Sequence, residues 1–226
     1  MRMFGKILVV AAAAAAMMTA ASAAPTCSST INLGADGAGV LNASSISSGT
    51  CVATQDKVWG SFNLGNLPSD TVLIFNLNSV GSLDHHQLSF SASYKAGTTY
   101  NWSYEVAVNS TAMPGTVITS IDTDFTQTVG GPSTLTKGLN PAGDAAISET
   151  KVGAVVQPGS VLSANFGAGI TDLMVTEQLI DNGTISSVTN TVTQFVPGRN
   201  IPEPATLMLL GAGLLGLGGL KRWKKK

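Results

Sequence analysis

The sequence predicts an all-β protein, built as an antiparallel β-sandwich or a jelly-roll-like domain, on three observations. Apolar and polar side chains alternate with a period of two over residues 87–94 and again over 100–108, as in half-buried strands. Ser, Thr and β-branched residues dominate the middle of the chain. No stretch outside the two terminal segments has a sustained helical period. One domain of ordinary size is therefore expected between those segments.

The clearest elements are the two alternating stretches. Lys95-Ala96-Gly97 between them has the composition of a turn, so the two strands are predicted to pair as a hairpin. Residues 27–50 are rich in small and polar residues and are expected to be an irregular or weakly stranded lead-in. Further strands are predicted, in chain order, at 57–63, 71–78, 116–122, 161–166, 171–180 and 184–195.

Turns and loops are expected where Gly, Pro, Asn and Asp gather. Asp181-Asn182-Gly183 predicts a hairpin turn between the last two strands. Gly130-Gly131-Pro132 and residues 139–144 interrupt the strand pattern and are expected to be loops.

The charge balance argues against a nucleic-acid partner. Residues 24–199 carry five basic and twelve acidic side chains, a net charge of −7, although the whole chain has a net charge of −1. An acidic domain repels phosphates, so no nucleic-acid binding is expected.

Cys27 and Cys51 are the only cysteines of the sequence, and both follow an N-terminal segment that directs export. An oxidising destination favours a disulfide between them. A catalytic thiol or a metal pair would need a nearby His or a Cys-x-x-Cys spacing, and neither is present.

The N-terminal segment has the three parts of a secretory signal peptide. Arg2 and Lys6 precede an uncharged run over residues 7–20, and small residues follow. Ala21 and Ala23 fit the cleavage pattern, which makes Ala24 the first mature residue and residues 1–23 the signal peptide. A retained membrane helix is the weaker interpretation, because the apolar run is short for a membrane span.

The other end also has three parts. Pro202-Glu203-Pro204 is followed by an apolar stretch over residues 205–220 and then by a basic tail over 221–226. The prolines keep the first part extended, so a helix can begin only after Pro204. At helical rise the apolar stretch measures roughly 24 Å, somewhat less than the roughly 30 Å of bilayer hydrocarbon. A short transmembrane helix is predicted, with its basic end on the cytoplasmic side. The basic residues that would stop transfer are Lys221, Arg222, Lys224, Lys225 and Lys226.

This C-terminal arrangement resembles the PEP-CTERM sorting signal, which combines Pro-Glu-Pro, a short Leu/Gly-rich helix and a basic cluster. The isoleucine at position 201 differs from the valine more usual before the motif. The resemblance implies that the chain is the substrate of an exosortase, a membrane cysteine protease or transpeptidase of Gram-negative bacteria, with processing near residues 202–204. A plain membrane anchor that is never cut is the alternative. The expected organisation is thus a signal peptide (1–23), an ectodomain (24–196), a linker (197–201) and a sorting signal (202–226).

Candidate chemical groups between the two terminal segments are few. The adjacent His85 and His86 lack further ligands in the sequence, and a solvated loop is expected there. Asp122 and Asp124 are a weak calcium candidate, because no glycine-turned acidic loop surrounds them. A glycosidase would need two carboxylates that face one cleft, and the sequence cannot pair Glu105, Glu149 or Glu177 in this way. The alternating aromatic residues Tyr100, Trp102 and Tyr104 could form a sugar-stacking face, but a stripe in the hydrophobic core is favoured.

The sequence therefore predicts a non-catalytic exported protein of the envelope or extracellular polysaccharide, with a structural or adhesive role and no cofactor or metal. Its expected partners are an exosortase-type enzyme and, before processing, the inner membrane, with extracellular polysaccharide as a further candidate. A carbohydrate-binding module is the alternative, which exposed Trp59 or Trp102 would favour. A secreted hydrolase is a third hypothesis and would need paired carboxylates with perturbed pKa values.

Overall fold

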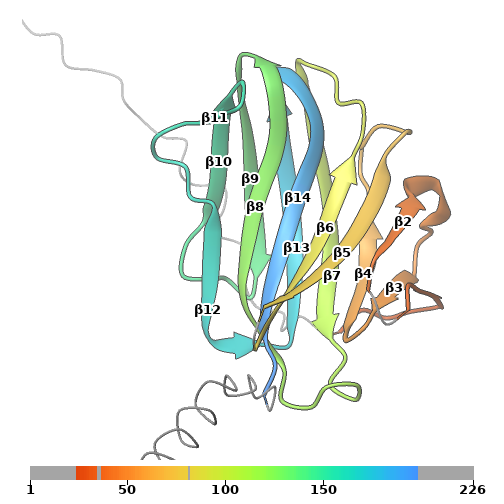
Figure 1. The fold of residues 1–226 in the computed structure, drawn as a ribbon. Helices are drawn as coiled ribbons and strands as arrows, with labels where there is room; N and C mark the ends of the chain where they lie inside the picture. Colours follow the sequence, from red (N-terminus) through yellow and green to blue (C-terminus); the bar gives the residue numbers. More distant parts are fainter. Residues whose placement is uncertain (1–23, 35–36, 81, 198–226) are drawn as a thin grey trace, which may run out of the picture.

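Two β-sheets packed face to face make up the protein in a computed structural model that describes residues 24–34, 37–80 and 82–197 (Figure 1). The eight-stranded sheet has the order β1 (Ser29–Asn32), β3 (Thr50–Thr54), β4 (Lys57–Asn63), β7 (Thr98–Val108), β13 (Asp172–Asp181), β9 (Pro132–Asn140), β10 (Ile147–Val152) and β11 (Val155–Val156). The six-stranded sheet has the order β12 (Ser163–Ile170), β8 (Val117–Gly130), β14 (Gly183–Phe195), β6 (Leu83–Ser91), β5 (Val72–Val80) and β2 (Gly39–Asn42). The one other regular element of the described residues is a 3₁₀ turn at Ala43–Ser45.

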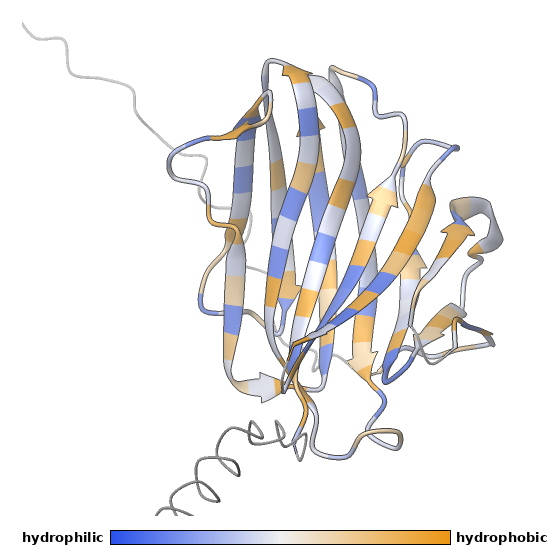
Figure 2. Ribbon diagram, viewed as in Figure 1, coloured by the Kyte–Doolittle hydropathy of each residue, from blue (hydrophilic) through white to orange (hydrophobic). Residues whose placement is uncertain are grey.

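The predicted fold class is confirmed: the described residues form an all-β sandwich. Neighbouring strands pair antiparallel, apart from β1 with β3, which are parallel. Figure 2 shows the apolar and polar bands alternating along the long strands. The apolar side chains of both sheets meet in one buried core that includes Phe90, Trp102 and Phe125.

The expected signal peptide and C-terminal helix lie outside the described residues. Within residues 24–34, 37–80 and 82–197, no helix has the length and apolar character needed to cross a membrane.

Both predicted hairpins are wrong. Strand β6 pairs with β5 and β14 in the six-stranded sheet, whereas β7 pairs with β4 and β13 in the other sheet. Likewise β13 and β14 lie in different sheets, so residues 181–183 carry the chain across the sandwich. The alternation of side chains identifies which face of a strand is buried, but a strand of either sheet buries one face against the same core.

Two segments expected to be loops are mostly strand. Strand β8 continues to Gly130 and β9 starts at Pro132, which leaves Gly131 alone between them. Strand β9 then extends to Asn140, into the second predicted loop. The lead-in over residues 27–50 contains two four-residue strands, β1 and β2, and the 3₁₀ turn, as expected of a weakly stranded segment.

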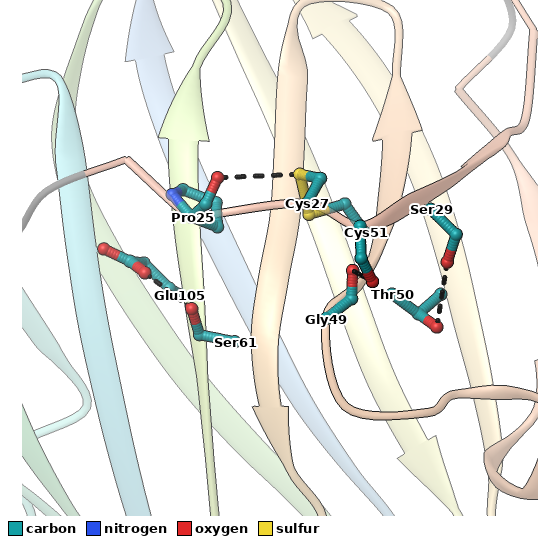
Figure 3. Close-up of a disulfide and its surroundings, with 9 residues drawn as sticks. Pro25, Cys27, Ser29, Gly49, Thr50, Cys51, Ser61 and Glu105 are labelled. Atoms are coloured by element: carbon teal, nitrogen blue, oxygen red, sulfur yellow. Dashed lines mark hydrogen bonds between the residues drawn. A yellow bond between two sulfur atoms is a disulfide. The ribbon is translucent and has the colours of Figure 1, made fainter.

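The predicted disulfide between Cys27 and Cys51 is confirmed, with the two Cα atoms 5.5 Å apart (Figure 3). Cys51 lies in β3 and is fully buried, whereas Cys27 precedes β1 and is exposed. The bond therefore fastens the start of the described chain to β3, the second strand of the eight-stranded sheet.

Replacing both Cys27 and Cys51 with serine is expected to lower the free energy of unfolding by about 3.5 kcal/mol. The disulfide joins residues 24 positions apart, and without it the unfolded chain gains conformational entropy. Urea unfolding of the oxidised wild type and of the double variant measures this difference. Equal midpoints in urea, or two thiols of the untreated wild type that react with an alkylating agent, would contradict the assignment.

Candidate functional site

The aromatic row of β7 lies in the core. Tyr100, Trp102 and Tyr104 are 5%, 3% and 0% exposed, and Trp59 is 1% exposed. The ring centroids of Trp102 and Phe90 are 5.5 Å apart, across the two sheets. The row is therefore the core stripe that the alternation predicted, and none of these rings forms a sugar-stacking face.

The outer face of the eight-stranded sheet instead carries an open polar groove of about 490 Å³. Strands β7, β13 and β9 lie side by side here and turn alternate side chains to solvent. Trp102 and Glu177 border the groove but their side chains are buried in the core. The other residues that line it carry amides, hydroxyls or no side chain: Asn63, Gly65, Asn101, Ser103, Thr136, Gly138, Thr176 and Gln178.

Hydrogen bonds hold the amides of this groove in place. Gln178 Nε2 donates to Asn101 Oδ1 over 3.0 Å, and the backbone N–H of Asn101 donates to Asn66 Oδ1 over 2.8 Å. The turn at Gly65 lies directly on β7, since a Cβ there would be 1.8 Å from the carbonyl oxygen of Asn101. Gly138 leaves space beside Thr176 that a side chain would fill. The groove is therefore preorganised, and its lining side chains are uncharged.

Sequence reasoning missed this groove, because its side chains come from strands that are far apart in the sequence. Their outward alternation was readable for β7, but the neighbours β13 and β9 are known only from the register of the sheet.

The described residues form three clusters of buried ionisable groups, which the sequence did not predict. In the first, Asp56 Oδ2 lies 3.3 Å from Lys57 Nζ and Asp56 Oδ1 lies 3.2 Å from His86 Nε2. Gln194 Nε2 donates to both Asp56 and Asp84. Burial opposes ionisation of Asp56, but the bond from His86 and the charge of Lys57 hold the pKa of Asp56 well below its ordinary value. Burial lowers the pKa of Lys57 to about 8 and also lowers that of His86.

The second cluster lies between the sheets near the middle of the core. Lys137 Nζ is 2.9 Å from Glu177 Oε2, and both side chains are fully buried. Asn190 donates from Nδ2 to Glu177 Oε1 over 2.8 Å and accepts at Oδ1 from Lys137 Nζ. Burial lowers the pKa of Lys137, and burial together with the nearby charge of Glu177 raises the pKa of Tyr104 well above its ordinary value.

The third cluster lies at the open edge where β10 approaches β8. Lys151 Nζ lies 3.1 Å from Glu149 Oε1, contacts Asp124 Oδ1, and lies 5.0 Å from the centre of the Phe125 ring. Burial raises the pKa of Glu149 to about 7. The side chain of Asp124 is 67% exposed, so this cluster is open to solvent on one side.

The expectation of a solvated loop at the histidines is wrong, because both residues lie within β6. His85 faces outward and bonds Thr193 Oγ1 over 3.0 Å, while His86 is 1% exposed and faces Asp56. The sequence did not indicate that Asp56, which lies across the sandwich, offsets the cost of burying the polar ring of His86.

The other candidate residues lie at separate places in the described part of the chain. Among residues 24–34, 37–80 and 82–197, no three His, Cys, Asp or Glu side chains are placed to hold a metal ion. Glu149 and Glu177 lie in different buried clusters, and Glu105 accepts a hydrogen bond from Ser61 over 2.9 Å. The signal-cleavage residues 21 and 23, the Pro-Glu-Pro sequence and the basic tail lie outside the described residues; Ala24 is the first described residue.

Comparison with protein families identifies the C-terminal region. Residues 200–222 match the PEP-CTERM protein-sorting motif, a match that includes Pro202, Glu203 and Pro204. The motif implies an exported protein that an exosortase processes at the membrane. No curated protein is significantly similar to the chain.

Solved structures give only distant matches. A structure of CapF with the inhibitor 3-isopropenyl-tropolone is 11% identical, with 62% of this chain and 31% of that chain covered and a TM-score of 0.25. The CBM22-1–GH10 modules of xylanase 10B of Clostridium thermocellum with xylohexaose are 13% identical, with 63% and 27% covered and a TM-score of 0.28. TmCBM61 with β-1,4-galactotriose is 12% identical, with 70% and 80% covered and a TM-score of 0.15. The chain thus spans less than a third of the length of the first two structures, and likeness at these TM-scores assigns no ligand or activity.

Proposed function

We propose that this protein, which carries a PEP-CTERM sorting motif at residues 200–222, is a non-catalytic structural or adhesive component of the outer envelope or extracellular polysaccharide. An exosortase would recognise the motif while the apolar stretch at 205–220 holds the chain in the inner membrane, and the sandwich would then be delivered outside.

The sorting motif is the observation that carries this proposal. The composition of the sandwich supports it, because an acidic domain with an internal disulfide suits an oxidising exterior. A non-catalytic role accords with the placement of the carboxylates, because Glu177, the ionisable residue that borders the groove, has a buried side chain paired with Lys137.

Substitution of the motif tests the proposed route. A variant with Pro202→Ala, Glu203→Gln and Pro204→Ala, expressed in the native host, is expected to remain in the membrane fraction with residues 205–226 attached. The matched control is Pro197→Ala, which changes a proline outside the motif and should be delivered like the wild type. Normal delivery and trimming of the triple variant would refute exosortase processing.

A second candidate function is binding of a neutral polysaccharide in the polar groove, and the preorganised amides favour it. Amide and hydroxyl side chains pair well with sugar hydroxyls, and a lining of uncharged side chains selects against charged ligands. This differs from the expected aromatic platform, because the rings lie in the core.

The double variant Asn101→Ala and Gln178→Ala is expected to weaken binding of the host's purified neutral polysaccharide at least tenfold, since it removes two hydrogen-bonding groups of about 1 kcal/mol each. Affinity electrophoresis with that polysaccharide measures the change. The matched control is Thr126→Ala with Ser187→Ala, an exposed hydrogen-bonded pair on the outer face of the other sheet, which should bind like the wild type. Equal weakening in both double variants, or no binding by the wild type, would eliminate the groove as a polysaccharide site.

A further inference from the structure

Three side chains in the core bring an amine, a carboxylate and a carboxamide together between the two sheets. Lys137 of β9 and Glu177 of β13 are directly opposite in the strand register, and both side chains point inward. Asn190 of β14 reaches them from the facing sheet. The group therefore connects the eight-stranded sheet with the six-stranded one.

The contacts place one carboxylate against both of the other groups. Glu177 Oε2 is 2.9 Å from Lys137 Nζ, and Glu177 Oε1 accepts a hydrogen bond from Asn190 Nδ2 over 2.8 Å. Lys137 Nζ in turn contacts the carboxamide oxygen of Asn190. A proton can thus pass from the amine to the carboxylate and from the carboxylate to the amide nitrogen without movement of the backbone.

The surroundings favour reaction between these groups. All three side chains are buried, and the aromatic rings of Trp102 and Tyr104 belong to the same core. Burial lowers the pKa of Lys137, which makes the nucleophilic neutral amine more accessible. Two groups held in contact also react as if at very high concentration, because their association has already been completed by folding.

We propose that Lys137 and Asn190 become joined by an intramolecular isopeptide bond, with Glu177 as the proton carrier. Glu177 takes a proton from the Lys137 ammonium, and the freed electron pair on Nζ attacks Cγ of Asn190. The Nζ–Cγ bond forms, the Cγ–Nδ2 bond breaks, and Nδ2 leaves as ammonia after receiving the first proton from Glu177. Glu177 then takes the second proton that Nζ gives up and passes it to the ammonia, which departs as ammonium. The balance is one lysine ammonium and one carboxamide giving one secondary amide and one ammonium ion, so no oxidant or other reactant is required.

The other buried lysines lack this arrangement. Lys151 has a buried carboxylate beside it, since Glu149 Oε1 lies 3.1 Å from Lys151 Nζ, but it contacts no carboxamide side chain in the described residues. The other carboxyl group that it contacts belongs to Asp124, which is 67% exposed, so water solvates that group. Lys57 lies beside the carboxylate of Asp56 and has no carboxamide among its ion-pair and hydrogen-bond contacts in the described residues. The bond is therefore assigned to Lys137 alone, and the other two lysines remain ion-paired.

The bond would tie β9 to β14 across the sandwich, between residues 53 positions apart in the chain. Together with the disulfide at the other end of the sheet, it would give a secreted domain a second covalent connection that reducing agents do not break. This inference goes beyond the proposed function and concerns the core, so it does not depend on the sorting motif.

Peptide mass spectrometry tests the proposal on the full chain, purified, denatured, reduced and digested with trypsin. Trypsin cannot cut after an acylated lysine, so the expected product is residues 96–151 joined to residues 152–199, lighter than the two separate peptides by one ammonia, about 17 Da. Recovery of the peptide that ends at Lys137, with Asn190 unmodified, would overturn the proposal. A bond at Lys151 and Asp124, which would release water instead, would overturn the assignment to Lys137.

Two variants separate the chemistry from folding. Glu177→Gln keeps the size of the side chain but removes the proton carrier, so the joined peptide is expected to disappear. Asn190→Asp keeps the electrophilic carbon and should form the same bond with loss of water, giving a product identical in mass to that of the wild type. Joined peptide at the wild-type level in Glu177→Gln would remove Glu177 from the mechanism, and circular dichroism of each variant shows whether the sandwich has formed. If both variants fail to fold, the wild-type digest alone still decides the proposal.

Discussion

Asp56→Ala is expected to destabilise the protein by about 3–5 kcal/mol at pH 7, because it leaves two buried basic side chains without their shared partner. Asp56 is fully buried and lies 3.3 Å from Lys57 Nζ and 3.2 Å from His86 Nε2. Since folded domains are stable by only about 5–15 kcal/mol, a loss of this size is a large fraction of the total free energy of unfolding. Urea unfolding followed by tryptophan fluorescence measures it.

The pH dependence distinguishes loss of the charge from loss of packing. The pKa of Asp56 is held below its ordinary value of 3.8, so its contribution is present above pH 3.8 and is lost as the pH falls through the folded-state pKa. The difference between wild type and Asp56→Ala should therefore be full at pH 7 and shrink below pH 3.8. The control Asp172→Asn changes a carboxylate that accepts a hydrogen bond from the hydroxyl of the neighbouring Thr171, and it should stay within about 0.5 kcal/mol of the wild type. A destabilisation by Asp56→Ala that is small at pH 7 would show that the buried cluster does not depend on this carboxylate.

Trp102→Ala is expected to cost about 3–5 kcal/mol, since it removes a large ring from the centre of the core. The ring is 3% exposed and its centroid lies 5.5 Å from that of Phe90 in the facing sheet. The space left cannot close without movement of two hydrogen-bonded sheets. Thermal unfolding measures the loss, and Trp102→Phe, which keeps an aromatic ring in place, should cost clearly less.

The same experiment bears on function. A Trp102→Ala protein as stable as the wild type would mean that the ring is in solvent, where it could stack on sugar rings. A strongly destabilised protein whose groove still binds polysaccharide in the folded fraction would support a recognition surface made of amides and hydroxyls.

The strand predictions were most accurate where apolar residues occupy every second position. The strand expected at residues 57–63 has the same bounds as β4, and the aromatic stripe of β7 lies in the core as expected. The partners of these strands were predicted wrongly, because side-chain alternation is the same for a hairpin and for two strands of opposite sheets. Residues 92–97 are long enough either to turn within one sheet or to cross to the other.

Strands β9 and β10 were missed because polar residues occupy many of their buried positions. The inward positions of β9 include Ser133 and Lys137, and those of β10 include Glu149 and Lys151. Such segments show no apolar period, although each charged side chain has a partner inside the fold. The partners lie on other strands, so neither the clusters nor the polar groove could be derived before the register was known.

The intact mass and the C-terminal peptide of the mature protein, recovered from its native host, test the central claim most directly. The account predicts a chain that begins at Ala24 and lacks the tail from near Pro204 onward, as expected of an exosortase substrate. Recovery of the peptide that contains Trp223 in the mature protein would contradict this account and leave an ordinary membrane-anchored chain.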